Sequence, residues 1–167
     1  MSITKELENL YFHDSSLRGI NVSFSDGNAR SCVLDIDYYN WEGNQKIRES
    51  APNDPWKWRR LILKFGYLAH IEFSAPDLVN RAQDLDEAEL GYALSAFEDE
   101  YKKFKVEFPR GKYPLFESGE VISIRFTTQN YSSSESGYLW VVGNDVSIGW
   151  EDADTLVGQI HIPIQNA

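Results

Sequence analysis

Apolar and polar residues alternate with a period of two over most of the chain, and this pattern predicts strands. Over residues 17–24 the alternation is typical of a half-buried strand, and a second alternating run covers residues 30–41. Asp26-Gly27 lies between the two runs and favours a tight turn, because both residues tolerate positive φ. The two runs therefore predict an antiparallel β-hairpin.

Further strands are predicted downstream. Residues 61–73 alternate over thirteen positions, which is longer than a usual strand, so we expect a bend or bulge at Gly66 or a split into two strands. Residues 122–126 form another alternating run. Two short runs flank Gly143-Asn144-Asp145 and predict a second hairpin, and residues 157–164 alternate again.

One segment has a helical period instead. Its apolar residues recur at spacings of three and four: Leu90, Leu94, Phe97, Tyr101 and Phe104. Asp84 is expected to cap the N-terminus, with Glu87 three residues later. Acidic residues crowd the start and lysines the end, which suits the helix macrodipole. We predict a helix over about 84–105 that buries its apolar face against a sheet.

These elements predict an α+β fold. The sheet is expected to be mainly antiparallel, as a single sheet or a sandwich of about 7–9 strands, with one principal helix at about 84–105. The pattern contains no internal repeat and no domain boundary. Residues 1–167 are therefore expected to form one domain, which suits a chain of this length.

Composition narrows the class of protein. Aromatic residues make up 14% of the chain, which argues against extended disorder. Acidic residues outnumber basic ones by 26 to 16, a net charge of −10, which disfavours nucleic-acid binding because phosphate contacts need a basic surface. No apolar run is long enough to span a membrane. The single cysteine, Cys32, cannot form an internal disulfide, so we expect a cytoplasmic protein.

Two carboxylates on the second predicted strand invite a chemical interpretation. Asp35 and Asp37 are two residues apart and therefore share a face, with side chains separated by roughly 7 Å. That separation suits inverting glycoside hydrolysis or a cation, whereas the simpler interpretation is an exposed polar strand face. Tyr39 and Trp41 share the face and could add a sugar or protein contact surface.

The histidines are the other chemical candidates. His13-Asp14 resembles the doublet of metal phosphohydrolases, but an Asx or Ser turn before the first strand explains it more simply. His13, His70 and His161 lack the close spacing that is typical of zinc ligands. We therefore predict no metal site, no cofactor and no catalytic residue.

The C-terminal part of the chain is acidic. No lysine or arginine follows Arg125, and residues 126–167 carry a net charge of −5. Glu151, Asp152 and Asp154 are the densest group of acids in this part. They form either a solvated surface or a docking surface for a basic protein, which electrostatic steering would favour.

The N-terminal third contains a recognisable combination of motifs. Phe12-His13-Asp14-Ser15 precedes the hairpin, and Leu34-Asp35-Ile36-Asp37-Tyr38 leads to Trp41. This combination resembles the start of small uncharacterised bacterial β-rich proteins, a resemblance that implies no activity. By analogy of size, charge and layout alone, some small acidic bacterial proteins are immunity proteins for secreted toxins.

The leading hypothesis is therefore a non-catalytic cytoplasmic binding protein, in its finest form an immunity-type protein that blocks a basic toxin. The alternative is an enzyme or carbohydrate-binding domain that uses the face formed by His13, Asp14, Asp35, Asp37 and Trp41. We expect no nucleic-acid or membrane partner.

Overall fold

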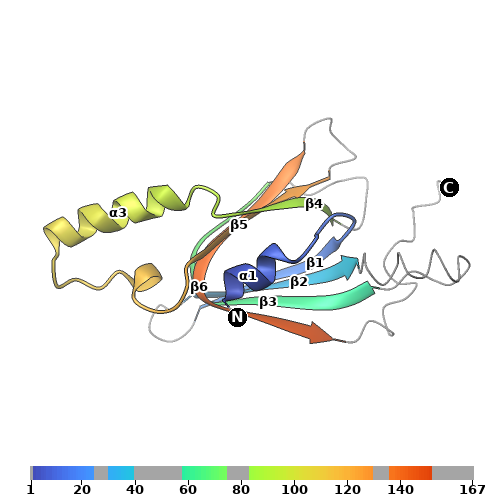
Figure 1. Cartoon of the computed structure of the whole chain (residues 1–167), viewed down its shortest axis with the longest axis horizontal. Helices are drawn as coiled ribbons and strands as arrows, with labels where there is room; N and C mark the ends of the chain where they lie inside the picture. The colour runs from blue at the N-terminus through green and yellow to red at the C-terminus, as the bar shows by residue number, and fades with distance from the viewer. Residues whose placement is uncertain (1, 25–29, 40–57, 75–82, 130–135, 152–167) are drawn as a thin grey trace, which may run out of the picture.

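The computed structural model describes residues 2–24, 30–39, 58–74, 83–129 and 136–151. Within them, six antiparallel strands close into a barrel in the order β1-β2-β3-β6-β5-β4 (Figure 1). The strands are β1 Ser16–Phe24, β2 Arg30–Tyr39, β3 Trp58–Phe73, β4 Gln83–Leu90, β5 Ile122–Thr128 and β6 Gly137–Glu151. The helices are α1 Ile3–Glu8, α3 Leu94–Glu107 and the 3₁₀ helix η1 Pro114–Phe116. The α+β class is confirmed, with six strands in these residues rather than the predicted 7–9.

The N-terminal hairpin is confirmed. β1 and β2 pair antiparallel from Ser16↔Asp37 to Phe24↔Arg30, with a register shift between Leu17 and Gly19. The connecting dipeptide Asp26-Gly27 lies outside the described residues, as do the run at 157–164 and Trp41. The barrel closes where β1 meets β4 through two residue pairs, Ser16↔Asp84 and Leu17↔Gln83.

Inward-facing apolar side chains fill the barrel. Fully buried strand residues of this core include Leu34, Ile36, Leu61, Leu63, Phe65, Leu68, Leu85, Ile124 and Phe126. Helix α1 lies across the strands in Figure 1, and Leu7 from this helix belongs to the same core. Phe12 joins it and meets Phe126 edge to face at 5.0 Å. Cys32 is buried in this core, and the burial raises the pKa of its thiol to about 11.

The predicted hairpin at Gly143-Asn144-Asp145 is wrong, because β6 runs through these residues as one strand. It pairs with β3 from Phe73↔Leu139 to Arg60↔Glu151. A turn at Asn144 would remove the partner from half of β3. The three residues instead accommodate an irregularity: the register shifts between Leu68 and His70, not at Gly66, and Asp145 adopts a positive φ of 52°.

The predicted helix begins ten residues too early. Residues 83–90 form β4, which pairs with β5 and closes the barrel against β1. Gly91 has a φ of +76° and Ala93 a φ of +49°, so the chain turns before α3 begins at Leu94. The register of the neighbouring strands therefore overrides the weak helical preference of an acidic segment. Asp84 is a buried strand residue and caps no helix.

The helix also does not bury its apolar face against the sheet. No residue of α3 is fully buried, and Figure 1 shows the helix projecting away from the barrel. Phe97 reaches the outer surface of β6 at Trp140, with ring centroids 6.0 Å apart. Tyr101 instead stacks on Phe116 of η1 at 4.8 Å. Among the described residues, no helix combines the length and apolar character that a membrane crossing requires.

Candidate functional site

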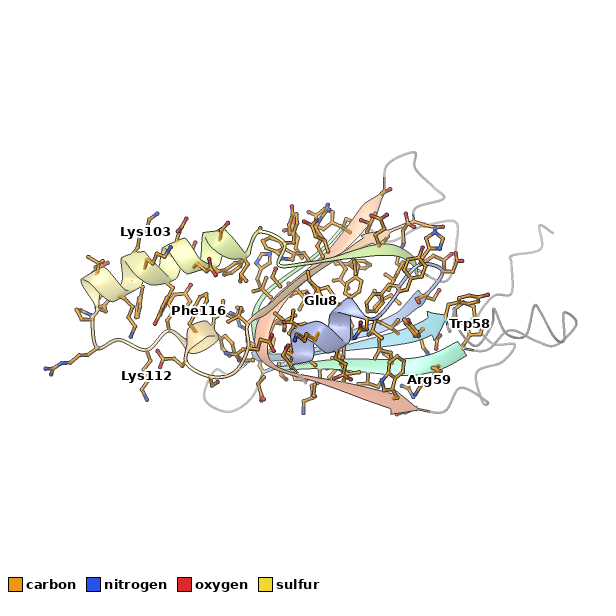
Figure 2. The ribbon with its side chains drawn as sticks, in the orientation of Figure 1. Glu8, Trp58, Arg59, Lys103, Lys112 and Phe116 are labelled. Atoms are coloured by element: carbon orange, nitrogen blue, oxygen red, sulfur yellow. The ribbon has the colours of Figure 1, made fainter. Side chains whose placement is uncertain are left out.

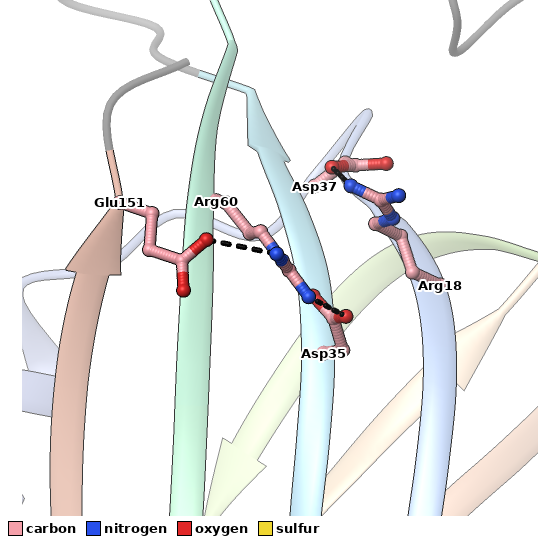
Figure 3. Close-up of polar contacts among 5 residues, drawn as sticks. All are labelled: Arg18, Asp35, Asp37, Arg60 and Glu151. Carbon is pink, nitrogen blue, oxygen red and sulfur yellow. Dashed lines mark hydrogen bonds and ion pairs between the residues drawn. The ribbon is translucent and has the colours of Figure 1, made fainter. Parts of the chain in front are cut away.

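Asp35 lies on the outer surface of β2 and is bound by an arginine from the neighbouring strand. Arg60 of β3 donates from Nε to Oδ1 at 2.9 Å and from Nη2 to Oδ2 at 2.7 Å. Its Nη1 also donates to Oε2 of Glu151 on β6 at 2.8 Å (Figure 3). The hydrogen bonds that Arg60 donates to Asp35 raise the pKa of Arg60 above its ordinary value. One guanidinium therefore bridges two carboxylates, and its pairing with Asp35 is bidentate.

Asp37 has a weaker partner and a drier environment. Nη1 of Arg18 on β1 lies 3.5 Å from Oδ1 of Asp37 (Figure 3). The Asp37 side chain is buried. Burial raises the pKa of Asp37 above its ordinary value of 3.8, and Arg18 opposes that rise. Inverting hydrolysis needs one carboxylate free to activate water. Both carboxylates here contact an arginine, which makes this face a strand-bridging ion-pair network.

The two carboxylates are expected to respond oppositely to amide substitution. The unfolded chain releases the Asp37 proton at a lower pH than the folded protein, so ionisation of Asp37 lowers the free energy of unfolding as pH rises above 3.8. Asp37→Asn should therefore match or exceed the stability of the wild type at pH 7, and the difference should shrink towards pH 3. The measurement is urea unfolding across this pH range.

Asp35→Asn is the matched control for that comparison. It removes the negative charge that accepts the two Arg60 hydrogen bonds. The free energy of unfolding should therefore fall by about 1–2 kcal/mol at pH 7, after allowance for solvent screening. Equal losses for both variants at pH 7 would contradict the assigned difference between the two carboxylates.

The aromatic residues predicted beside these carboxylates do not extend the surface. Tyr39 is 1% exposed and packs edge to face on Trp58 at 5.0 Å. A buried ring cannot stack on a sugar. Trp41 lies outside the described residues. Arg59 lies over the ring of Trp150 at 4.2 Å, so the basic segment that begins β3 contributes a cation–π contact within the fold.

His13 and Asp14 occupy a turn at the junction of β1 and β4. The amide of Ser15 donates to the carbonyl of Phe12 at 2.9 Å, and Asp14 has a φ of 63°, so the segment is a turn closed by a backbone hydrogen bond. Nδ1 of His13 lies 3.1 Å from Oδ1 of Asp14, and Nε2 lies 3.1 Å from Oδ1 of Asp86 on β4. The contacts therefore group His13 with Asp14 and Asp86, and group Asp35 and Asp37 with Arg60 and Arg18.

The remaining histidines lie elsewhere. His70 packs against Trp140 with ring centroids 4.3 Å apart, and its Nε2 lies 3.6 Å from Oε2 of Glu72. His161 lies outside the described residues. Within the part of the chain that the structure describes, no group of three or more His, Cys, Asp or Glu side chains could hold a metal ion.

An aromatic cluster that was not predicted from the sequence lies on the outer surface of β5 and β6. The guanidinium of Arg125 lies between the rings of Tyr92, at 4.9 Å, and Tyr138, at 4.7 Å. Trp140 donates from Nε1 to Oγ of Ser123 at 3.0 Å. The outward alternation of Tyr138 and Trp140 with buried Leu139 was the available signal. These contacts join the strands to the segment that leads into α3.

The predicted acidic docking surface is only partly described. Glu151 ends β6 with its side chain 57% exposed, and its carboxylate accepts the hydrogen bond from Arg60. Asp152 and Asp154 lie outside the described residues.

No protein-family model, curated protein or solved structure matches this chain significantly.

Proposed function

We propose that this protein is a non-catalytic binding protein whose partner is a basic protein. The observation that carries the proposal is a contrast between two groups of carboxylates. Asp35 and Asp37 contact arginines, whereas Asp14 and Asp86 contact an imidazole at the barrel junction. We call Asp14, Asp86 and the adjacent exposed Glu87 the acidic seam.

The acidic seam is suited to docking by its position and exposure. The side chains of Asp14 and Asp86 are 46% and 37% exposed, and Glu87 is exposed at the irregularity in β4 between Leu85 and Ala88. Exposed charges of one sign raise the rate at which an oppositely charged protein associates. The net charge of −10 acts in the same direction.

More specifically, we propose an immunity-type role in the cytoplasm, with a basic toxin as the partner. A reducing compartment is supported by the lone, buried cysteine. The enzyme or carbohydrate-binding alternative has less support, because its carboxylates are engaged by Arg18 and Arg60 and Tyr39 is buried.

Three variants that each remove three negative charges test the proposal. The first neutralises the acidic seam with Asp14→Asn, Asp86→Asn and Glu87→Gln, where asparagine retains the positive φ of residue 14. The second neutralises Glu151, Asp152 and Asp154, and the third neutralises the exposed acids of α3, Glu98, Asp99 and Glu100. All three have the same net charge, so only the position of the lost charges differs.

The wild type and the three variants are immobilised, and proteins captured from the native host are identified and quantified. We expect the wild type to recover one basic protein and the seam variant to lose it. The seam variant should associate with that protein more slowly than the wild type does, and the two association rates should converge at high salt. Loss with the Glu151 variant alone would place the surface at the end of β6. Equal recovery by all four proteins, or capture of no basic protein, would contradict the proposal.

A further inference from the structure

A second surface is formed by an arm that projects from the barrel. The arm consists of α3 and the returning segment 108–117, and Figure 1 shows it extending beyond the strands. Aromatic rings of the helix pack on rings of the returning segment: Tyr101 on Phe116 at 4.8 Å, and Phe104 on Tyr113 at 5.4 Å. The arm therefore has a small apolar interior of its own.

The barrel anchors the returning segment firmly. Leu115 is 1% exposed, and the side-chain amide of buried Asn144 donates to the carbonyls of Pro114 and Leu115, both at 2.9 Å. At the other end, Phe97 packs on His70 and Trp140 of the outer barrel surface. Both ends of the arm are therefore held by the barrel, and its far end is presented at a fixed position.

The far end of the arm is basic in an acidic protein. Residues 102–112, here called the arm tip, contain five lysines and arginines and one acid, so their net charge is 5 − 1 = +4. The rest of the chain has 11 basic and 25 acidic residues, a net charge of −14. Within the described residues, Lys103, Arg110 and Lys112 form no ion pair. Figure 2 shows Lys103 and Lys112 on the arm, away from the strands.

Two other lysines of the arm tip have contacts that leave their charges in place. Nζ of Lys102 lies 3.5 Å from Oδ1 of Asp99, in an exposed pair one helical turn apart. Nζ of Lys105 donates to the carbonyl of Gly111 at 2.7 Å. A neutral carbonyl does not cancel an ammonium charge, and an exposed pair at this distance is largely screened by solvent.

The arm tip also exposes apolar side chains among these charges. Val106 is 84% exposed and Phe108 is 50% exposed, whereas Tyr101 and Phe104 of α3 pack on rings of the returning segment. Apolar side chains ringed by lysines match the interface of an anionic bilayer, where apolar groups enter the acyl boundary and lysines meet the headgroups.

The length of the arm separates its charge from the acidic barrel. A helix of 14 residues is about 21 Å long at 1.5 Å per residue. The Debye length at physiological ionic strength is about 8 Å. The repulsion between the barrel and an anionic surface is therefore strongly screened when only the arm tip touches that surface.

We propose that the arm tip binds the surface of anionic phospholipid membranes, with Val106 and Phe108 entering the headgroup region. The aliphatic Val106 favours lipid over nucleic acid, because base recognition on single strands uses aromatic stacking and an aliphatic side chain supplies none. Lysine also outnumbers arginine at the arm tip by four to one, which suits the diffuse field of a lipid surface better than bidentate phosphate recognition.

Vesicle flotation of the full chain tests the electrostatic part of the proposal. The vesicles contain phosphatidylcholine alone or with about 30% phosphatidylserine, in the range of an anionic leaflet. We expect binding only to the anionic vesicles, and Lys102→Glu with Lys103→Glu should weaken it by at least about tenfold. Lys5→Glu with Lys64→Glu makes the same change in net charge at exposed sites outside the arm and should have much less effect.

A second pair of variants tests the apolar contact. Val106→Ser with Phe108→Ser should weaken binding by about tenfold, because each side chain loses its partition into the interface. The matched control is Val22→Ser with Phe24→Ser, which removes the same two residue types from exposed positions on β1, 37% and 75% exposed. Circular dichroism of every variant establishes that the helix is retained.

A fluorescent label reports where the arm tip lies. Val106→Cys introduces an exposed thiol, whereas Cys32 is 0% exposed and has a raised pKa, so an environment-sensitive dye labels the new position selectively. Dye emission should increase with anionic vesicles and remain unchanged with neutral ones. No binding to anionic vesicles at low salt, equal losses in the control variants, or tighter binding to single-stranded RNA or polyglutamate than to vesicles would each overturn the proposal.

Discussion

Phe126→Ala is expected to lower the free energy of unfolding by about 3–5 kcal/mol, the range for truncating a buried phenylalanine. Phe126 is 0% exposed in β5, and its ring contacts Phe12 edge to face at 5.0 Å. The substitution leaves a cavity between the barrel wall and the segment that carries His13. Because this cavity is enclosed by neighbouring strands, it cannot collapse without moving the ladder.

Urea unfolding followed by tryptophan fluorescence measures that loss. Phe24→Ala is the matched control, because the same side chain is 75% exposed on β1 and its removal should cost less than about 0.5 kcal/mol. Similar losses at the two positions would mean that the barrel interior is not packed around Phe126.

Gly143→Ala is expected to destabilise the protein by about 3 kcal/mol, at the upper end of the usual range for overpacking. A Cβ atom at this position would lie 2.2 Å from the carbonyl oxygen of Tyr67 and 2.9 Å from a ring carbon of Phe65. The carbonyl is backbone in a paired strand, so it cannot rotate away as the end of a flexible side chain can. Gly143 pairs with both Leu68 and Ile122, next to the register shift between Leu68 and His70.

Gly149→Ala is the control in the same strand. Its Cβ would meet Ile62 at 3.7 Å, an ordinary contact, so stability should be unchanged or rise by up to about 1 kcal/mol as the unfolded chain loses freedom. Both values come from urea unfolding of the purified variants. A Gly143→Ala variant as stable as Gly149→Ala would show that β6 does not approach β3 this closely.

Local pattern was enough to predict the hairpin and the strand at 122–126, because alternation directly records which side of a strand is buried. The same reasoning misplaced the start of the helix. Leu90 falls into register with Leu94 and Phe97 at helical spacing, but it ends a strand and packs against the barrel core. A single apolar residue fits both periods, and only pairing with β5 decides between them.

Turn signals were ambiguous for a related reason. Gly143-Asn144-Asp145 has the composition of a hairpin turn, and the same residue types serve a bulge within a long strand. Asn144 donates to the carbonyls of Pro114 and Leu115, about thirty residues away in the chain. The sequence does not show this contact, so the local pattern favoured a hairpin turn, which is the more common use of these residue types.

The sequence by itself determined the α+β class, the N-terminal hairpin, the burial of Cys32 and the position of Asp35 and Asp37 on one strand, because each depends on the local alternation of side chains. Only the tertiary structure decided which charges meet. Arg60 reaches Asp35 and Glu151, which are 25 and 91 residues away, and His13 reaches Asp86 across the barrel closure. The physical reason is that strand register aligns residues from distant segments, and only these contacts distinguish a carboxylate that is paired with arginine from one that contacts histidine.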